Sequence, residues 1–217
     1  MYVAIEGVIG VGKTTLARLL QPIFQADLLL EVFEENPFLS NFYLDRERYA
    51  FQTQIFFLLS RYHQQRSRVA EALEKQHHLI ADYSFEKDAL FAGINLHGDE
   101  LEMYHRVHEA LAEKVAVPDL VVYLRADSDV LMQRIALRDR PYERKMEREY
   151  IDELNQAYDR YFMGAGRCPF PILIIDTNHL DFVHRPADLK LVENRIRQAL
   201  KLGPFQPELP LGVVEGI

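Results

Sequence analysis

A glycine-rich segment near the start of the chain has the residue types and spacing that bind phosphate. Gly7 is followed by four residues and then by Gly12, Lys13 and Thr14, which matches the phosphate loop G-x-x-x-x-G-K-[ST]. Glycines leave backbone N–H groups free to point at phosphate oxygens, and the positive end of the helix that follows strengthens the binding. We expect the phosphates of a nucleoside triphosphate to be bound by Gly7, Val8, Ile9, Gly10, Val11, Gly12, Lys13, Thr14 and Thr15.

Carboxylates follow two other apolar runs. Glu31, Glu34 and Glu35 lie at the end of the run 28–32, and Asp82 follows the run 78–81. A glutamate beside an acceptor hydroxyl can serve as the general base of phosphoryl transfer. An aspartate that ends a strand behind a phosphate loop is typical of a Mg²⁺ ligand. The sequence therefore predicts a metal site at Thr14 and Asp82, although a structural role for Asp82 is the alternative.

Three arginines could stabilise the charge of the transferred group. Arg134 and Arg138 are four residues apart, so they lie on one face of a predicted helix, and Arg140 follows. Arginines closing over a triphosphate would stabilise charge in the transition state. We interpret residues 134–148 as an arginine-rich lid, with a solvated basic surface as the alternative.

The spacing of apolar residues indicates the elements that position these side chains. Near-continuous apolar runs over 2–5, 28–32, 78–81, 120–124 and 172–175 are separated by helical patterns, which is typical of parallel strands covered on both faces. One long amphipathic helix is expected over 50–75 and another from 101 to 115. We predict a single α/β domain over 1–202, with a five-stranded parallel sheet and ligands at the carboxyl ends of its strands. The proline-containing tail 203–217 is expected to be irregular.

Composition narrows the functional classes. The net charge of −8 argues against binding to a nucleic-acid polymer, and the single cysteine excludes an internal disulfide framework. No apolar stretch approaches the ~20 residues that cross a bilayer. We expect a cytoplasmic protein that does not bind membranes.

Together these residues resemble the deoxynucleoside kinases, and more closely the bacterial deoxyadenosine and deoxyguanosine kinases, from residue 1 to about residue 200. The matching segments are the phosphate loop, residues 31–39, Tyr43, Phe51 to Gln54 with Arg61, Asp82 to Ser84 with Asp88, the lid arginines, and Glu149 with Tyr150. The resemblance implies a three-layer fold of the phosphate-loop NTPase type and an ATP- and Mg²⁺-dependent kinase. Such an enzyme transfers the γ-phosphate of ATP to the 5′-hydroxyl of a deoxynucleoside, here a purine deoxynucleoside.

The resemblance also assigns roles to side chains. Lys13 and the lid arginines would neutralise the transferring phosphoryl group, and Glu31 would be the general base. Tyr43 and Glu149 would bind the sugar 3′-hydroxyl. Asp82 would contact the substrate and bind the metal ion.

Gln54, Arg61 and Asp88 would read the base. Gln54 and Arg61 are two helical turns apart, so they share one face. The choice among adenine, guanine and a pyrimidine stays open, because a glutamine amide can turn over.

One departure concerns the third strand, where many members carry an arginine after the acidic residue and this chain has Tyr83. The role of that arginine is left to Lys87 or to a lid arginine. Two alternatives follow. Thymidylate kinase or another nucleoside monophosphate kinase would need cations in the acidic segment 31–43, and a non-catalytic nucleotide-binding regulator would explain Tyr83. The two long helices favour a homodimer.

Overall fold

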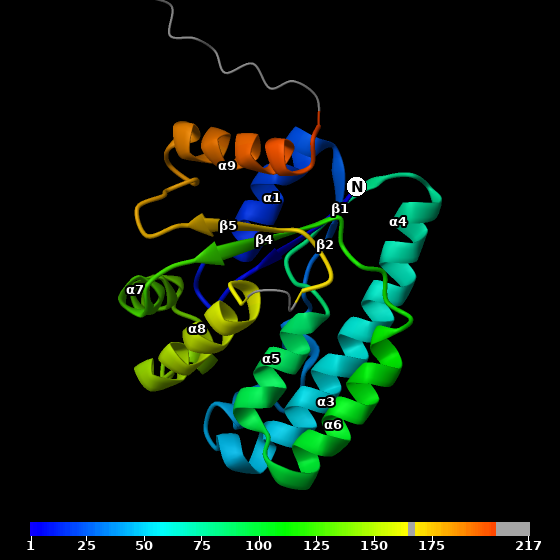
Figure 1. Cartoon of the computed structure of the whole chain (residues 1–217). Helices are drawn as coiled ribbons and strands as arrows, with labels where there is room; N and C mark the ends of the chain where they lie inside the picture. Colours follow the sequence, from blue (N-terminus) through cyan, green and yellow to red (C-terminus); the bar gives the residue numbers. More distant parts are fainter. Residues whose placement is uncertain (165–167, 203–217) are drawn as a thin grey trace, which may run out of the picture.

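A five-stranded parallel sheet forms the centre of the computed structural model, which describes residues 1–164 and 168–202 (Figure 1). The strand order is β2-β3-β1-β4-β5, with every neighbouring pair parallel. The strands are β1 (Tyr2–Glu6), β2 (Ala26–Leu29), β3 (His78–Ala81), β4 (Leu120–Arg125) and β5 (Ile172–Asp176). The predicted parallel α/β sheet is confirmed. The tail 203–217 lies outside the described residues.

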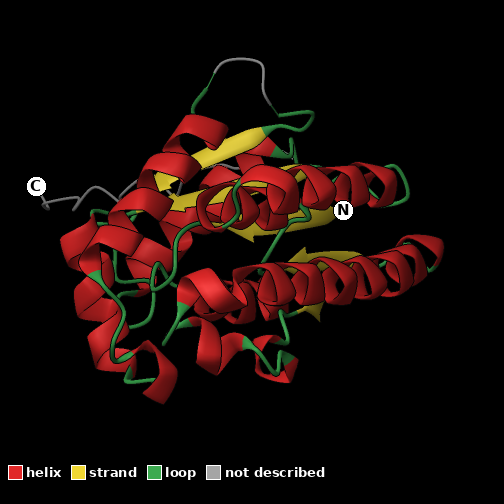
Figure 2. Cartoon of the chain, turned by 90° about the horizontal axis from the view of Figure 1, so that it is seen from below, coloured by secondary structure: helices red, strands yellow, loops and turns green. Residues whose placement is uncertain are grey.

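Helices cover both faces of this sheet. In Figure 1, α1 and α9 lie above the sheet, whereas α3, α5, α6 and α8 lie below it, so the molecule has three layers. Figure 2 shows the helices of the lower layer from below. The helices are α1 (Lys13–Phe24), α2 (Leu39–Phe42), α3 (Arg46–Gln64), α4 (Ala70–Glu74), α5 (Glu86–Asn95), α6 (Gly98–Ala112), α7 (Ser128–Arg138), α8 (Arg148–Phe162) and α9 (Pro186–Ala199). No described helix is both long enough and apolar enough to span a membrane.

The two long helices differ from their predicted bounds. The first begins at Arg46, because the carboxylate of Asp45 accepts the backbone N–H of Arg48 at 3.2 Å and caps the helix. It continues through a π-helical segment, Gln65–Val69, into α4. The second, α6, ends at Ala112, three residues before the expected end. Short helical segments also occur at Phe33–Glu35 and Pro141–Glu143.

The predicted strand over 28–32 is wrong in its bounds, and the error matters for the site. β2 pairs only with β3, and the last pair joins Leu29 to Ala81. Beyond it, the carboxylate of Asp82 accepts the backbone N–H of Glu31 at 2.8 Å. A hydrogen bond to a side chain thus takes the place of the next backbone hydrogen bond between β2 and β3. Glu31 therefore lies in a loop at the carboxyl edge of the sheet.

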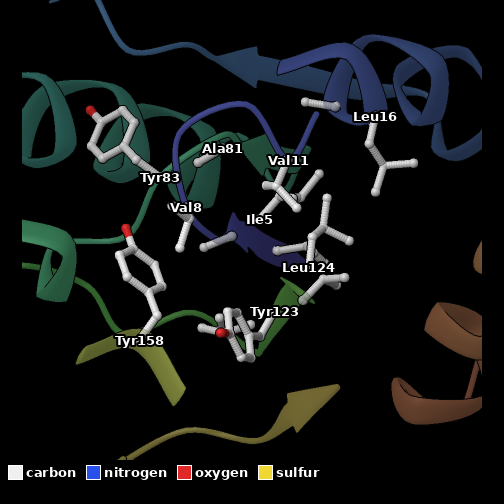
Figure 3. Packing of buried hydrophobic residues seen from close by; sticks show 14 of the residues in the cluster. Ile5, Val8, Val11, Leu16, Ala81, Tyr83, Tyr123, Leu124 and Tyr158 are labelled. Atoms are coloured by element: carbon white, nitrogen blue, oxygen red, sulfur yellow. The ribbon is translucent and has the colours of Figure 1, made fainter. Parts of the chain in front are cut away.

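The core fixes the start of the phosphate loop. All five residues of β1 are buried, and Val8 and Val11 of the loop itself are buried beneath it (Figure 3). In the same hydrophobic core, the rings of Tyr123 and Tyr158 stack with centroids 6.0 Å apart. The loop is therefore anchored to the core at two points, which keeps its backbone in one conformation.

Candidate active site

The phosphate loop connects β1 to α1 through three glycines with positive φ. The φ angles are 146° at Gly7, 87° at Gly10 and 104° at Gly12, values that residues with a Cβ atom rarely adopt. A Cβ atom on Gly7 would collide with the carbonyl oxygen of Leu124, and one on Gly12 would lie 3.0 Å from the ring of Phe182. Glycine is required at these positions by the backbone and by its neighbours.

We predict that Gly7→Ala destabilises the protein by about 2 kcal/mol or more, since it adds backbone strain and a steric collision. ATP binding should be lost with the loop conformation. Gly93→Ala is the matched control, because nothing lies within 4 Å of a Cβ atom at this position in α5. Alanine there should stabilise the protein by up to about 1 kcal/mol. Urea unfolding and ATP titration of both variants measure this difference, and equal stability of the two would contradict it.

Lys13, Thr14 and Asp82 meet at the carboxyl edge of the sheet, as predicted. The Nζ of Lys13 donates to the carbonyl oxygens of Gly7 (2.6 Å) and Val8 (3.1 Å). Burial, together with the nearby charge of Lys87, lowers the pKa of Lys13 to about 8. The Thr14 hydroxyl donates to the carboxylate of Asp82, which is 68 residues away in the chain. A hydroxyl and a carboxylate side by side are hard oxygen ligands that suit Mg²⁺.

Glu31 is held by two cations, one at each carboxylate oxygen. Its Oε1 accepts from the Nε of Arg61 at 3.0 Å, and its Oε2 accepts from the Nζ of Lys87 at 2.5 Å. Burial opposes ionisation of Glu31, but the charges of Arg61 and Lys87 outweigh it and hold the pKa well below its usual range. Glu31 is therefore a fixed carboxylate at neutral pH.

A cavity that is partly open to solvent joins these groups, and its empty space, open solvent included, is about 700 Å³. The phosphate loop, α2, α3 and α5 all contribute side chains to its lining. Ten residues expected at the site line it, namely Ile9, Gly10, Lys13, Thr14, Glu31, Tyr43, Arg61, Asp82, Arg138 and Arg140. The rings of Phe33, Phe57, Phe91 and Tyr142 supply apolar wall. Residues predicted to bind the phosphate donor and residues predicted to bind the phosphate acceptor thus line the same cavity.

The predicted base-reading residues, Gln54, Arg61 and Asp88, are all buried. Arg61 forms an ion pair with Asp88, which is fully buried. Gln54 is also buried, and its Oε1 has no hydrogen-bond partner among the residues that the structure describes. Arg61 reaches the cavity, whereas Gln54 and Asp88 are not among its lining residues.

The three arginines of the predicted lid make different contacts. Arg134 donates to the carbonyl oxygen of Thr177 at 2.7 Å and to that of Val11 at 3.4 Å, so it braces the phosphate loop against the loop after β5. Arg138 and Arg140 line the cavity, and both form ion pairs with Glu143, at 2.5 and 3.5 Å. Arg134 is not among the residues that line the cavity, and closure of the three arginines over a triphosphate stays a prediction.

The structure does not bring Glu149 to the cavity. Glu149 is exposed in the first turn of α8, whereas Glu143 is 4 % exposed and lines the cavity beside Tyr43. Burial raises the pKa of Tyr43 well above its usual range, and Tyr150 and Glu143 add to the rise. Glu143 and Glu149 are six residues apart in a segment that is rich in both acidic and basic residues. The sequence signal for Glu143 was its position inside the lid, three residues after Arg140.

Tyr83 is not among the residues that line the cavity. Its side chain is fully buried, and its hydroxyl donates to the Oε1 of Gln64 in α3 at 2.8 Å. It therefore contributes packing rather than a polar group to the site.

Comparisons with known proteins agree with this geometry. The family model for deoxynucleoside kinase matches residues 3–201. The chain is 32% identical to the deoxyguanosine kinase of Bacillus subtilis, covering 92% of this chain and 97% of that protein. It is 30% identical to the deoxyadenosine kinase of Dictyostelium discoideum, over 84% of this chain and 74% of that one. A structure of deoxyadenosine kinase from M. mycoides with bound dCTP superposes with a TM-score of 0.77 and 25% identity, covering 91% of this chain and all of that one. The chain therefore belongs to the deoxynucleoside kinase family of ATP-dependent phosphotransferases.

Proposed function

We propose that this protein phosphorylates the 5′-hydroxyl of a purine deoxynucleoside, with deoxyguanosine as the preferred acceptor. The observation that carries the proposal is that one cavity is lined both by Lys13 of the phosphate loop and by Glu31 and Arg61. A donor phosphate and an acceptor hydroxyl bound in this space would be held close together, which is the main requirement of phosphoryl transfer.

The pair Arg61 and Asp88 supports guanine as the base. Guanine presents acceptors at O6 and N7, which suit an arginine, and it carries N–H donors on its pairing edge, which suit a carboxylate. Relatives named deoxyguanosine kinase agree with this preference.

On the acceptor side, Glu31 takes the proton of the 5′-hydroxyl while the bond from O5′ to the γ-phosphorus forms. On the donor side, Lys13, Arg138 and Arg140 stabilise the charge on the phosphoryl oxygens. Thr14 and Asp82 would hold Mg²⁺, which neutralises phosphate charge when bound.

A homodimer and a cytoplasmic location are further proposals. Leu59 of α3 and Met103 of α6 are 41% and 59% exposed, and apolar side chains on two long helices would be covered in a dimer. Sedimentation of the purified protein measures the oligomeric state.

The experiment that tests the function is a panel of acceptors assayed for ADP release. The panel contains deoxyguanosine, deoxyadenosine, deoxycytidine, thymidine, guanosine and dGMP. We expect the fastest turnover with deoxyguanosine and none with dGMP. Turnover of dGMP without turnover of deoxyguanosine would make the protein a monophosphate kinase, and no turnover with any acceptor would make it a non-catalytic binder.

We further propose that Glu143, with Tyr43, binds the sugar 3′-hydroxyl in place of Glu149. Glu143→Gln removes a charge-assisted hydrogen bond of about 1.5–3 kcal/mol, so kcat/KM for deoxyguanosine should fall about 10- to 100-fold. Glu149→Gln is the matched control and should stay within about twofold, because its side chain is exposed.

The acceptor 2′,3′-dideoxyguanosine separates binding of the sugar from other effects. It lacks the 3′-hydroxyl, so the part of the Glu143→Gln loss that comes from the sugar should disappear with this acceptor, and any remaining loss measures the weakened ion pairs with Arg138 and Arg140. A larger loss in Glu149→Gln than in Glu143→Gln would restore the original assignment.

A further inference from the structure

The two cations on Glu31 differ in what else they bind. Arg61 contacts Glu31 through one part of its guanidinium group and Asp88 through another. In the proposed function, the same arginine reads the base, so its hydrogen bonds are redistributed when a nucleoside enters. Arg61 therefore cannot keep all its hydrogen bonds to Glu31 while it also binds the base.

Lys87 has no such second carboxylate partner among the described ion pairs, and it bonds the other oxygen of Glu31. It is the second residue of α5 and is only 6 % exposed. Its Nζ lies 5.7 Å from the centre of the Phe91 ring, one turn further along the same helix. The side chain is thus almost fully buried at the wall of the cavity.

Other groups that could hold Glu31 are directed elsewhere. Tyr83 donates to Gln64, and Arg138 and Arg140 are paired with Glu143. Lys13 donates to carbonyl oxygens of its own loop. Within residues 1–164 and 168–202, the ion pairs of Glu31 are with Arg61 and Lys87.

We propose that Lys87 is the positioning residue of the reaction, the fixed cation that holds Glu31 in place at Oε2 while Arg61 turns to the base. This proposal rests on the proposed role of Glu31 as the general base. With Oε2 held, Oε1 faces the 5′-hydroxyl and takes its proton. The bond from O5′ to the γ-phosphorus forms, the bond from the γ-phosphorus to the β,γ-bridging oxygen breaks, and ADP leaves with that electron pair.

The test is a double-mutant cycle between Lys87 and Glu31, with deoxyguanosine as acceptor. Lys87→Met keeps the length of the side chain and removes the charge, and it should lower kcat on the order of 30-fold while KM for ATP stays within about twofold. Lys87→Arg keeps a cation and should recover kcat to within about fivefold of the wild type. In the Glu31→Gln background, Lys87→Met should cost less than about threefold more, because Lys87 acts through Glu31.

Controls separate this role from a loss of folding. Lys114→Met changes an exposed lysine near the end of α6 and should leave kcat unchanged. Thermal unfolding and ATP binding are measured for every variant, and Lys87→Arg provides a folded reference if Lys87→Met is destabilised.

The outcomes also distinguish the two proposals. An equal loss from Lys87→Met in both backgrounds would show that Lys87 acts on the phosphoryl group and not through Glu31, and would overturn the inference. Full activity of Lys87→Met alongside an inactive Glu31→Gln would overturn it while leaving the general base in place. Full activity of Glu31→Gln alone would overturn the assignment of the base itself.

Discussion

Glu31→Gln should lower kcat for deoxyguanosine by about three orders of magnitude, since general base catalysis contributes about 10²- to 10⁴-fold. Glutamine has nearly the same shape but cannot accept the proton of the 5′-hydroxyl. Arg61 and Lys87 hold the pKa of Glu31 low, so we expect the wild-type carboxylate to be ionised, and therefore competent, throughout the neutral pH range. The Kd of ATP should change less than about twofold, because Lys13 and the phosphate loop are untouched.

Glu35→Gln is the matched control for this prediction. Glu35 belongs to the same acidic segment but is exposed, and its removal should leave kcat within about twofold of the wild type. Single-turnover kinetics and calorimetric ATP binding separate the chemical step from folding and donor binding. A Glu31→Gln enzyme with wild-type kcat would assign the base to another residue.

Asp88→Ala should combine the largest loss of stability with a loss of acceptor binding. Asp88 is fully buried against Arg61, and removing one partner of a buried ion pair costs about 3–5 kcal/mol. We expect the lower end of this range, because Arg61 keeps Glu31 as a second partner. For deoxyguanosine, kcat/KM should fall about 100-fold, because Arg61, which lines the cavity, loses the buried carboxylate that holds its guanidinium group in place.

An exposed ion pair gives the matched comparison. Glu71 and Lys75 are four residues apart, and both side chains are more than half exposed. Glu71→Ala should therefore change the free energy of unfolding by less than about 1 kcal/mol. Urea unfolding of both variants measures the difference. Equal effects of Asp88→Ala and Glu71→Ala on stability would contradict the account of the buried pair.

The features that depend on local pattern could be predicted from the sequence. The loop from Gly7 to Thr14 has a fixed spacing, and the near-continuous apolar runs indicated parallel strands. Because the carboxyl ends of parallel strands share one edge, the meeting of Thr14 with Asp82 followed from the fold class. The family and the reaction expected from these motifs are confirmed by the comparisons, which do not support the alternatives of a monophosphate kinase or a non-catalytic regulator.

The features that depend on side-chain direction could not be predicted. The end of β2 is set by the length of β3 and by the hydrogen bond from Glu31 to Asp82, which are tertiary contacts. Glu143 and Glu149 differ in burial and not in residue type, so only the path of the lid separates them. In the same way, the direction of Lys87 toward Glu31 depends on how α5 packs beside the sheet.

Acceptor-dependent ADP release tests the central claim, transfer to a 5′-hydroxyl within this cavity, most directly. The wild-type protein is assayed with ATP alone, with added deoxyguanosine, and with 2′,5′-dideoxyguanosine, which lacks only the reacting hydroxyl. The account predicts that only deoxyguanosine raises ADP release above background, that the product is dGMP, and that the 5′-deoxy analogue competes with deoxyguanosine. ADP release that is equal with deoxyguanosine, with the analogue and with ATP alone would contradict it.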